Sequence, residues 1–482
     1  MKQLYIILMF LLPLSLPAQS LDTKKMKQLD ALFDAIESHD QGMGSLSLYY
    51  KGREVYQRSI GFADVENNIR ASADTRYRVG SITKSLTAAI ILQMVEEGKI
   101  ALSTTLSTYY SEFESADLIS IEHMLNHTSG LNNYTNSPEY PSREQETMSE
   151  QDLVEWFVQH ENLFPPGEKQ EYSNTAYVLL SLIAEKMDKK PFAEIVQDRL
   201  SKPLQLDNTY IGGKIGDRPN EAHSYSAIDG WVRHSETDMS LPRGAGAIVS
   251  TAGDINKFYS ALFTGKLLKP ATLEQMKPES DYGFGVALFN FYDKKAMGHG
   301  GSIDRFLSSA GHFEIDELTV TYLSNGESFG INDILIGVLS IYFDKPYELP
   351  DFEKMSLVLA MPKIIEDPDV IKKAQTLLDR GADINAQSSQ GETALIIAGF
   401  IANKPELMKF LIERGADVNA ANINGDTALI DAAYYGRNEN LEILLENGAK
   451  PGIKNKRGLT AMDVAKKNEH KSTVKLLEAH SN

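Results

Sequence analysis

The chain has 482 residues, which is too long for one core of ordinary size and predicts two or three domains. Hydrophobic residues make up 42% and charged residues 24%, as in ordinary globular proteins, so extensive disorder is not expected. The net charge of −18 argues against a nucleic-acid partner, and the lack of cysteine excludes disulfides and zinc–cysteine sites.

The first residues have the pattern of a secretory signal peptide. Met1-Lys2 supplies a positive start, residues 4–16 form an apolar run, and Leu16-Pro17-Ala18 is typical of a signal-peptidase site. The alternative is an uncleaved membrane anchor, but this run is shorter than the about 20 residues that span a bilayer. We therefore expect residues 1–18 to be removed and the protein to be exported, to a periplasm or out of the cell, with no membrane span left.

Residues 22–350 mix helical and strand patterns, which predicts an α+β domain. Hydrophobic spacing indicates the elements in chain order: a helix over 29–36, a hairpin of strands 45–49 and 53–56, a helix over 81–95, a strand over 318–323 and a helix over 334–343. Pro346 and Pro350 then interrupt any helix, so we expect this domain to end at residue 350.

A Ser-x-x-Lys pattern, from Ser81 to Lys84, opens the helix predicted over 81–95. A serine at a helix N-terminus has its oxygen beside the positive end of the helix dipole, which favours an alkoxide. Lys84 lies one turn further on the same face, where a desolvated lysine could accept the serine proton. Alone the pattern is weak, because a capping serine and a solvated lysine have the same spacing.

Two Tyr-x-Asn triplets follow, Tyr134-Thr135-Asn136 and Tyr172-Ser173-Asn174. The second is preceded by Phe164-Pro165-Pro166-Gly167 and followed by an apolar helical pattern over 176–184. The Tyr-x-Asn pattern alone does not choose between the two triplets, but this setting resembles that of the serine hydrolase family described below, and the resemblance favours Tyr172 and Asn174 as the functional pair. We interpret Tyr134 as a loop aromatic.

The third motif is His299-Gly300-Gly301, followed by Ser302. Gly301 allows the backbone to approach a substrate closely. A histidine of ordinary pKa is mostly neutral at pH 7, so His299 offers no permanent charge. Arg305 could supply a charge for a substrate carboxylate, but a surface arginine fits the sequence equally well.

In order and spacing, these motifs resemble the catalytic elements of the penicillin-recognising serine hydrolases, a family of class C β-lactamases, D-alanyl-D-alanine carboxypeptidases and related esterases. The resemblance covers about residues 40–345 and implies an antiparallel sheet flanked by helices, beside an all-helical lobe. The roles that it implies are nucleophile for Ser81, proton transfer for Lys84 and Tyr172, and substrate binding for Asn174, His299, Gly301 and Ser302, with the Ser81 and Ser302 amides forming an oxyanion hole.

His299 departs from the family's Lys-Thr-Gly, in which the lysine charge meets a substrate carboxylate. Histidine at this place is found in carboxypeptidases, D-aminopeptidases and esterases of the family. The resemblance therefore implies action on a peptide or ester carbonyl more than efficient hydrolysis of β-lactams.

No cofactor or metal is expected. His123 and His127 are spaced as in a zinc-binding helix, but Met124 stands where a His-Glu-x-x-His motif needs its glutamate. The following Thr128-Ser129-Gly130-Leu131 resembles a structural signature of the same family. We therefore interpret the two histidines as bracing a loop.

The last quarter of the chain repeats itself with a period of about 33 residues. Gly-Ala-Asp recurs in full or in part at 381–383, 415–417 and 448–450, and Gly-x-Thr-Ala-Leu or a variant of it at 391–395, 425–429 and 458–462. The pattern resembles ankyrin repeats, whose helix pairs stack because none can bury its apolar face alone. We expect an all-α stack over 352–480, with a degenerate first repeat near Met355.

Two functions are compatible with the sequence. The leading hypothesis is an exported serine hydrolase that forms an acyl-enzyme on Ser81 with a small-molecule or peptide substrate, while the repeats bind a protein partner. The alternative is a catalytically weak or inactive hydrolase fold that displays the ankyrin stack. A stack that merely caps the enzyme is also compatible with the repeat pattern.

Overall fold

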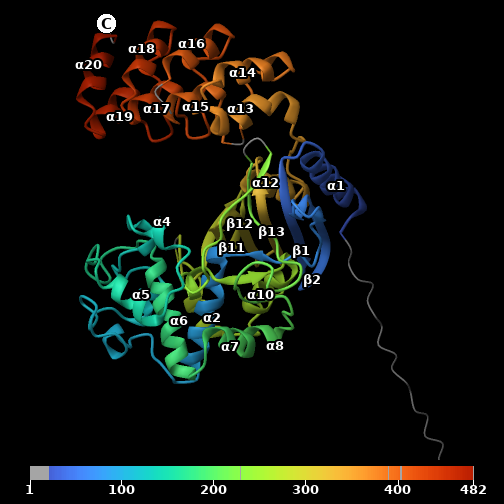
Figure 1. The fold of residues 1–482 in the computed structure, drawn as a ribbon, viewed down its shortest axis with the longest axis vertical. Helices are drawn as coiled ribbons and strands as arrows, with labels where there is room; N and C mark the ends of the chain where they lie inside the picture. Colours follow the sequence, from blue (N-terminus) through green and yellow to red (C-terminus); the bar gives the residue numbers. More distant parts are fainter. Residues whose placement is uncertain (1–20, 228–229, 280, 389, 402–403, 481–482) are drawn as a thin grey trace, which may run out of the picture.

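A computed structural model describes residues 21–227, 230–279, 281–388, 390–401 and 404–480 (Figure 1). The predicted signal peptide, residues 1–18, lies outside the described residues. Among the described helices, none has the length and apolarity needed to cross a bilayer.

A six-stranded antiparallel sheet forms the centre of the first domain, in the order β10-β11-β12-β13-β1-β2. The strands are β1 (Gly42–Tyr50), β2 (Arg53–Ile60), β10 (Ala287–Phe291), β11 (Lys294–Ile303), β12 (Phe306–Phe313) and β13 (Leu318–Glu327). The first strand of the chain therefore pairs with the last, with Ser47 opposite Thr321. The N-terminal hairpin of β1 and β2 therefore extends a sheet whose other four strands come from the C-terminal part of the domain.

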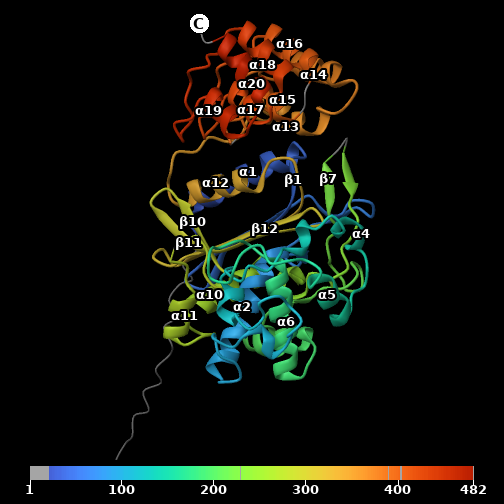
Figure 2. The same ribbon diagram turned by 90° about the vertical axis from the view of Figure 1, so that its left-hand side faces the viewer.

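Helices cover both faces of this sheet. Helices α1 (Thr23–Ser38) and α12 (Ile331–Tyr342) pack on the face that Leu46 and Leu48 join, while Ser45 on the other face is hydrogen-bonded to the Tyr77 hydroxyl at 2.9 Å. Figure 2 shows α1 and α12 above the sheet and helices such as α2, α6 and α10 below it. The helices and strands predicted from residue spacing at both ends of the domain are confirmed.

The helical lobe lies on the lower face of the sheet. Its helices are α2 (Thr83–Glu96), α3 (Ile121–Leu125), α4 (Tyr140–Arg143), α5 (Glu150–Phe157), α6 (Asn174–Asp188), α7 (Phe192–Val196), α8 (Lys202–Leu204), α9 (Arg243–Gly246), α10 (Ala252–Phe263) and α11 (Pro270–Met276). Short strands surround the lobe: β3 (Phe62–Asp64), β4 (Ile69–Arg70), β5 (Tyr77–Arg78), β6 (Tyr210–Ile211), β7 (Tyr225–Ala227), β8 (Trp231–Arg233) and β9 (Ile248–Ser250).

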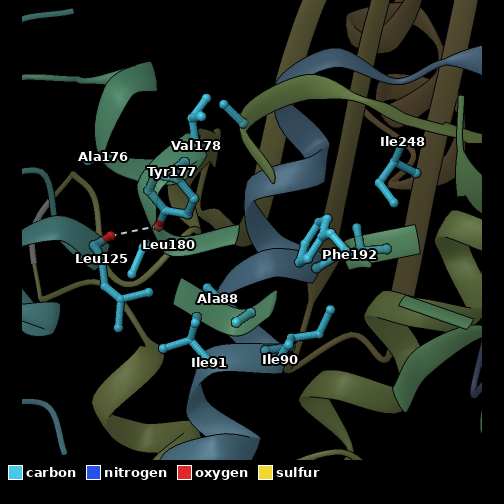
Figure 3. Packing of buried hydrophobic residues seen from close by; sticks show 14 of the residues in the cluster. Ala88, Ile90, Ile91, Leu125, Ala176, Tyr177, Val178, Leu180, Phe192 and Ile248 are labelled. Carbon is cyan, nitrogen blue, oxygen red and sulfur yellow. Dashed lines mark hydrogen bonds between the residues drawn. The ribbon is translucent and has the colours of Figure 1, made fainter. Parts of the chain in front are cut away.

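Helix α2 is the centre of the lobe, because almost all of its side chains are buried. A helix that is apolar on every side must be enclosed by its neighbours. Figure 3 shows Ala88, Ile90 and Ile91 of α2 within the same apolar cluster as side chains of α6. The Tyr177 hydroxyl donates to the Leu125 carbonyl at 2.7 Å, which ties α6 to α3. The start of α2 is thereby held rigidly under the sheet.

The C-terminal quarter folds as a stack of paired helices. They are α13 (Phe352–Ile364), α14 (Val370–Asp379), α15 (Ala394–Ile401), α16 (Pro405–Glu413), α17 (Ala428–Tyr434), α18 (Asn438–Glu446), α19 (Ala461–Lys467) and α20 (Lys471–Ala479). Gly391, Gly425 and Gly458 have φ angles of +72°, +77° and +75°, which L-residues with a side chain rarely adopt. The glycine recurs in each repeat because the turn at this position needs a positive φ angle.

Helix α13 belongs to two hydrophobic cores. Phe352 is buried in the core of the sheet domain and contacts the Phe329 ring edge-to-face at 5.0 Å between centroids. Leu357 and Met361, further along the same helix, lie in the core of the stack. The Lys363 ammonium also donates to Ser328 Oγ at 2.6 Å. The stack is therefore attached beyond α1 and α12, as Figure 2 shows.

Candidate active site

Ser81 lies in a 3-10 turn, Gly80–Ile82, that leads directly into α2. Gly80 has a φ of +52°, and a β-carbon there would lie 2.8 Å from the Ser302 nitrogen. Only glycine fits both the backbone angle and this close approach. The turn places the Ser81 oxygen at the N-terminal end of α2, where the helix dipole favours negative charge.

Lys84 lies one turn into α2, and no part of its side chain is exposed. Its Nζ donates to Ser81 Oγ at 3.0 Å, to Asn174 Oδ1 at 2.7 Å and to the Ala245 carbonyl at 2.8 Å. Burial lowers the pKa of Lys84 well below 10.5, because the ammonium loses its solvation. The amine is thus held against the serine and is easier to deprotonate than a surface lysine.

Tyr172 completes the group on the other side of Lys84. Its ring centroid is 4.7 Å from Lys84 Nζ, and Ser81 lies close enough to its phenol to influence the pKa of that group. Although 38% of the Tyr172 surface is exposed, loss of solvation at the phenol raises the pKa of Tyr172 above 10, and the nearby Ser81 opposes this only in part. The structure therefore brings together a hydroxyl, an amine and a phenol that lie far apart in the sequence.

Asn174 is the first residue of α6, whose N-terminus is capped by the Ser173 side chain. Besides accepting from Lys84, the Asn174 amide donates through Nδ2 to Asn133 Oδ1 at 3.1 Å and to Thr135 Oγ1 at 3.2 Å. These partners fix which end of the amide faces Lys84. Asn174 is placed to position the amine as well as to meet a substrate.

Strand β11 passes against the Ser81 turn, because Gly301 has no side chain. A methyl group on Gly301 would clash with the Val79 carbonyl and lie 2.8 Å from the Ser81 nitrogen. Ser302, the next residue, is exposed, and its nitrogen faces Gly80. The backbone amides of Ser81 and Ser302 are thereby close neighbours, as an oxyanion hole requires.

His299 on β11 is buried, with 6% of its surface exposed. Its Nε2 is 2.6 Å from the Tyr282 hydroxyl, and its Nδ1 contacts the Gly300 carbonyl. A carbonyl can only accept, so Nδ1 carries the proton and Nε2 accepts from Tyr282. Burial and the nearby Lys84 charge lower the pKa of His299 to about 3. His299 is therefore neutral and supplies no charge for a carboxylate.

Sequence reasoning missed three contributors to the site. Tyr282 holds His299, Asn133 orients Asn174, and Ala245 offers its carbonyl to Lys84. The segment around Ala245 is rich in glycine and packs tightly against α6, because a β-carbon on Gly244 would lie 2.6 Å from Ser181 Cβ. None of the three belongs to a recurring motif, so no sequence pattern marks them.

The other residues that the sequence offered as candidates for the site do not join Ser81, Lys84 and Tyr172. Tyr134 is buried in the lobe and stacks on Phe157 at 5.3 Å between ring centroids. His123 and Ser120 form a capping box at the start of α3. Arg305 is exposed with a φ of +77°, an angle that favours glycine. Within the described residues, no group of three or more acidic or histidine side chains could hold a metal ion.

Comparison with known protein families gives two matches. A model described as Beta-lactamase matches residues 29–333, and one described as Ankyrin repeats (3 copies) matches residues 366–455. Penicillin-binding protein 4* of Bacillus subtilis is 25% identical over 356 residues, which cover 68% of this chain and 78% of that protein. Teichoic acid D-alanine hydrolase of Staphylococcus aureus is 26% identical over 261 residues, or 50% of this chain and 62% of that protein.

Solved structures show the same similarity. D-amino acid amidase from Ochrobactrum anthropi SV3 superposes with a TM-score of 0.60 at 26% identity, over 67% of this chain and 99% of that one. D-stereospecific amidohydrolase from Streptomyces sp. gives a TM-score of 0.57 at 26% identity, over 65% of this chain and 98% of that one. Both similarities leave about a third of this chain unmatched.

Proposed function

We propose that this chain, which belongs to the beta-lactamase family of serine hydrolases and ends in ankyrin repeats, hydrolyses an amide or ester bond through an acyl-enzyme on Ser81. One observation carries the proposal: Lys84 Nζ lies 3.0 Å from Ser81 Oγ and 4.7 Å from the centroid of the Tyr172 ring, so that the three side chains meet at one place. The alternative of an inactive fold leaves this buried, uncompensated lysine without a purpose.

The directions of the two pKa shifts assign the proton transfers. Lys84 is the base, because its lowered pKa makes the neutral amine accessible at a lower pH than in an exposed lysine. Tyr172 remains a phenol, because its pKa is raised, so it is the proton donor to the leaving group. Ser81 Oγ then attacks the carbonyl carbon, its proton passes to Lys84, and the Tyr172 proton goes to the departing amine or alcohol. Lys84 returns its proton to Tyr172.

Water completes the cycle by the reverse route. It attacks the acyl carbonyl, gives a proton to the Lys84–Tyr172 pair, and the ester bond to Ser81 breaks as Oγ regains a proton. In both halves the amides of Ser81 and Ser302 hold the negative oxygen. Removal of one such donor from an oxyanion hole costs about 10²–10³-fold in kcat.

The neutral His299 favours substrates whose leaving group carries no carboxylate. Burial holds its pKa at about 3, and both ring nitrogens are engaged by Tyr282 and Gly300. Relatives include a D-amino acid amidase and a teichoic acid D-alanine hydrolase. We therefore place D-aminoacyl amides and esters ahead of β-lactams and of peptides with a free C-terminus.

The ankyrin repeats are proposed to bind a protein partner, as such stacks do through an extended surface. Export through cleavage of residues 1–18 is part of the same proposal and rests on the N-terminal sequence alone. N-terminal sequencing of the protein secreted by its own host checks this part. A start near residue 19 is expected, and an intact Met1 in the mature protein contradicts export by cleavage.

The test of the chemistry is covalent labelling of the purified protein with a fluorophosphonate, followed by mass spectrometry of its peptides. We expect one label on Ser81, absent from Ser81→Ala. Ser472→Ala is the matched control, because Ser472 and Lys475 repeat the Ser-x-x-Lys pattern on α20. No label on the native protein, together with no cleavage of D-phenylalaninamide or p-nitrophenyl acetate, would support the inactive fold.

Tyr134 is the matched control for Tyr172, because it fits the same Tyr-x-Asn pattern but is buried in the lobe, where its ring stacks on Phe157. Tyr172→Phe removes the proton donor and should lower kcat for D-phenylalaninamide by about 10²–10⁴-fold. Tyr134→Phe should leave kcat within about threefold, because no hydrogen bond of the site uses its hydroxyl. Equal losses in the two variants would contradict the assignment.

A further inference from the structure

His127 lies against the Tyr172 ring and is hydrogen-bonded to both sequence neighbours of Tyr172. The His127 and Tyr172 ring centroids are 4.4 Å apart. The backbone N–H of Glu171 donates to the His127 carbonyl at 2.8 Å, and the backbone N–H of Ser173 donates to His127 Nδ1 at 3.2 Å. The residue before Tyr172 and the residue after it are therefore bonded to the same histidine.

These contacts determine the protonation state of His127. Because Nδ1 accepts from Ser173, a neutral imidazole must carry its proton on Nε2. Burial, with smaller contributions from Lys84 and His299, holds the pKa of His127 well below 6.5. Nε2 is buried and has no hydrogen-bond partner among the described residues. Both the bond from Ser173 and the lowered pKa favour the neutral ring, with Nδ1 as an acceptor for the Ser173 backbone N–H.

The rest of the surroundings leave the ring little room. The Tyr177 ring lies 5.2 Å and the Tyr282 ring 4.7 Å from the His127 ring, centroid to centroid. The backbone of His127 is left-handed, with a φ of +61°, an angle that histidine, like asparagine and aspartate, adopts more often than most residues with a side chain. A residue that only braced this loop would need neither an acceptor at Nδ1 nor an aromatic ring against Tyr172.

We propose that His127 is a positioning residue for Tyr172: it holds the backbone on both sides of the tyrosine and the face of its ring, and so sets the distance from the phenol to Ser81. This inference rests on the proposed function, because it concerns the proton donor of that reaction. It assigns His127 no contact with substrate. His127 would then position Tyr172 in addition to bracing its own loop.

Two substitutions separate the contacts. His127→Asn keeps an acceptor close to the position of Nδ1 and tolerates the left-handed backbone. His127→Phe keeps a flat ring against Tyr172 but removes the acceptor for Ser173. His123→Phe is the control, because His123 is in the same segment, four residues earlier, and is bonded to Ser120 and Leu118 rather than to the Tyr172 segment.

We expect His127→Phe to lower kcat for D-phenylalaninamide by about 30-fold while KM changes by less than about threefold, because proton transfer depends steeply on donor position. His127→Asn should recover to within about fivefold of native kcat, and His123→Phe should stay within about twofold. In the Tyr172→Phe background, His127→Phe should cost no further kcat, since it acts through the phenol.

Three results would overturn the inference: native kcat in His127→Phe, no recovery in His127→Asn, or an undiminished further loss in the Tyr172→Phe background, which is the mark of a general structural role. Crystal structures of the two His127 variants provide a readout that needs no activity. Tyr172 should be displaced from Ser81 in His127→Phe and remain in place in His127→Asn. If the native protein proves inactive, the proposed function fails while this comparison still decides the role of His127.

Discussion

At the scale of single residues, the site is a compromise between burial and charge. Lys84 is fully enclosed, and its three hydrogen bonds to Ser81, Asn174 and Ala245 use all three donors of an ammonium. Enclosure lowers its pKa, because no carboxylate lies nearby to stabilise the charge. The result is an amine that remains ordered in either protonation state.

The pH dependence of hydrolysis follows from these shifts. Below the lowered pKa of Lys84 the ammonium cannot accept the serine proton, so kcat/KM should fall tenfold per pH unit on the acid side. The raised pKa of Tyr172 keeps the phenol protonated up to pH 10, so no alkaline loss is expected below that value. A pH–rate profile with p-nitrophenyl acetate measures both limbs.

The control for this profile is His299→Gln. Because the pKa of His299 is held at about 3, its removal should leave the midpoint of the acid limb unchanged. The Gln side chain still offers an acceptor to Tyr282. A midpoint that moves by a pH unit or more in this variant would mean that His299, and not Lys84, limits the rate on the acid side.

The sequence allowed the motif residues to be named in advance, and folding brings them together, whereas the residues that support them could not be named. Ser81, Lys84 and Tyr172 are recognisable because the chemistry fixes their type and order. Tyr282 and Asn133 are ordinary residues in loops, and only the folded chain shows that they hold His299 and Asn174. Residue type and spacing contain no signal for such contacts.

At the scale of elements, glycines determine how closely β11 can approach the start of α2. Gly301→Ala should push β11 away from the Ser81 turn, because the methyl group would meet the Val79 carbonyl and the Ser81 nitrogen. Separation of the two oxyanion amides should lower kcat/KM by about 10²–10³-fold. Steady-state kinetics with D-phenylalaninamide checks this.

Gly300→Ala is the matched control, one residue earlier on the same strand. A β-carbon there would meet only the Ser308 carbonyl, at an ordinary 3.6 Å. We expect kcat/KM within about threefold of native and an unchanged melting temperature. If both alanine variants lose activity equally, the strand as a whole is sensitive, and the close approach at Gly301 is not the reason.

Elements with regular spacing were predicted well. Leu29, Leu32, Phe33 and Ile36 lie on the buried face of α1, and the strands at 45–49 and 318–323 pair with each other in the sheet. The start of α2 differs in detail, because Ser81 lies in a 3-10 turn before the helix proper. A tight turn at a close backbone contact has no periodic signature, so hydrophobic spacing could not resolve it.

At the scale of the whole molecule, the two parts share α13. Phe352, with 4% of its surface exposed, is buried against Phe329 of the sheet domain, although α13 is also the first helix of the stack. Phe352→Ala should destabilise the sheet domain by about 3 kcal/mol, because it removes a buried aromatic side chain. Heat inactivation of the hydrolase should then occur about 5 °C lower.

Phe410→Ala is the control for this prediction, because Phe410 packs within the stack on α16. It should lower the melting transition of the repeats in calorimetry and leave the inactivation temperature of the hydrolase unchanged. Equal inactivation temperatures for Phe352→Ala and the native protein would show that the stack contributes nothing to the stability of the sheet domain.

Sequence reasoning divided the chain into its two parts but could not foresee this shared helix. Pro346 and Pro350 mark where helical structure stops, and α13 begins directly after them. Prolines report on the local backbone and say nothing of which core a following side chain enters. Assignment of Phe352 to the sheet domain therefore required the folded structure.

The repeats are attached on the side of the sheet that α1 and α12 cover, whereas α2, which follows the Ser81 turn, lies on the opposite side (Figure 2). A macromolecule held by the stack would not obstruct the nucleophile, so capture and turnover can proceed simultaneously. Binding through the stack would leave the kcat of each enzyme molecule unchanged and would raise the local concentration of the hydrolase wherever the bound macromolecule is abundant. Which substrates the enzyme hydrolyses in the cell would then depend on where the stack holds it as well as on which bonds it can break.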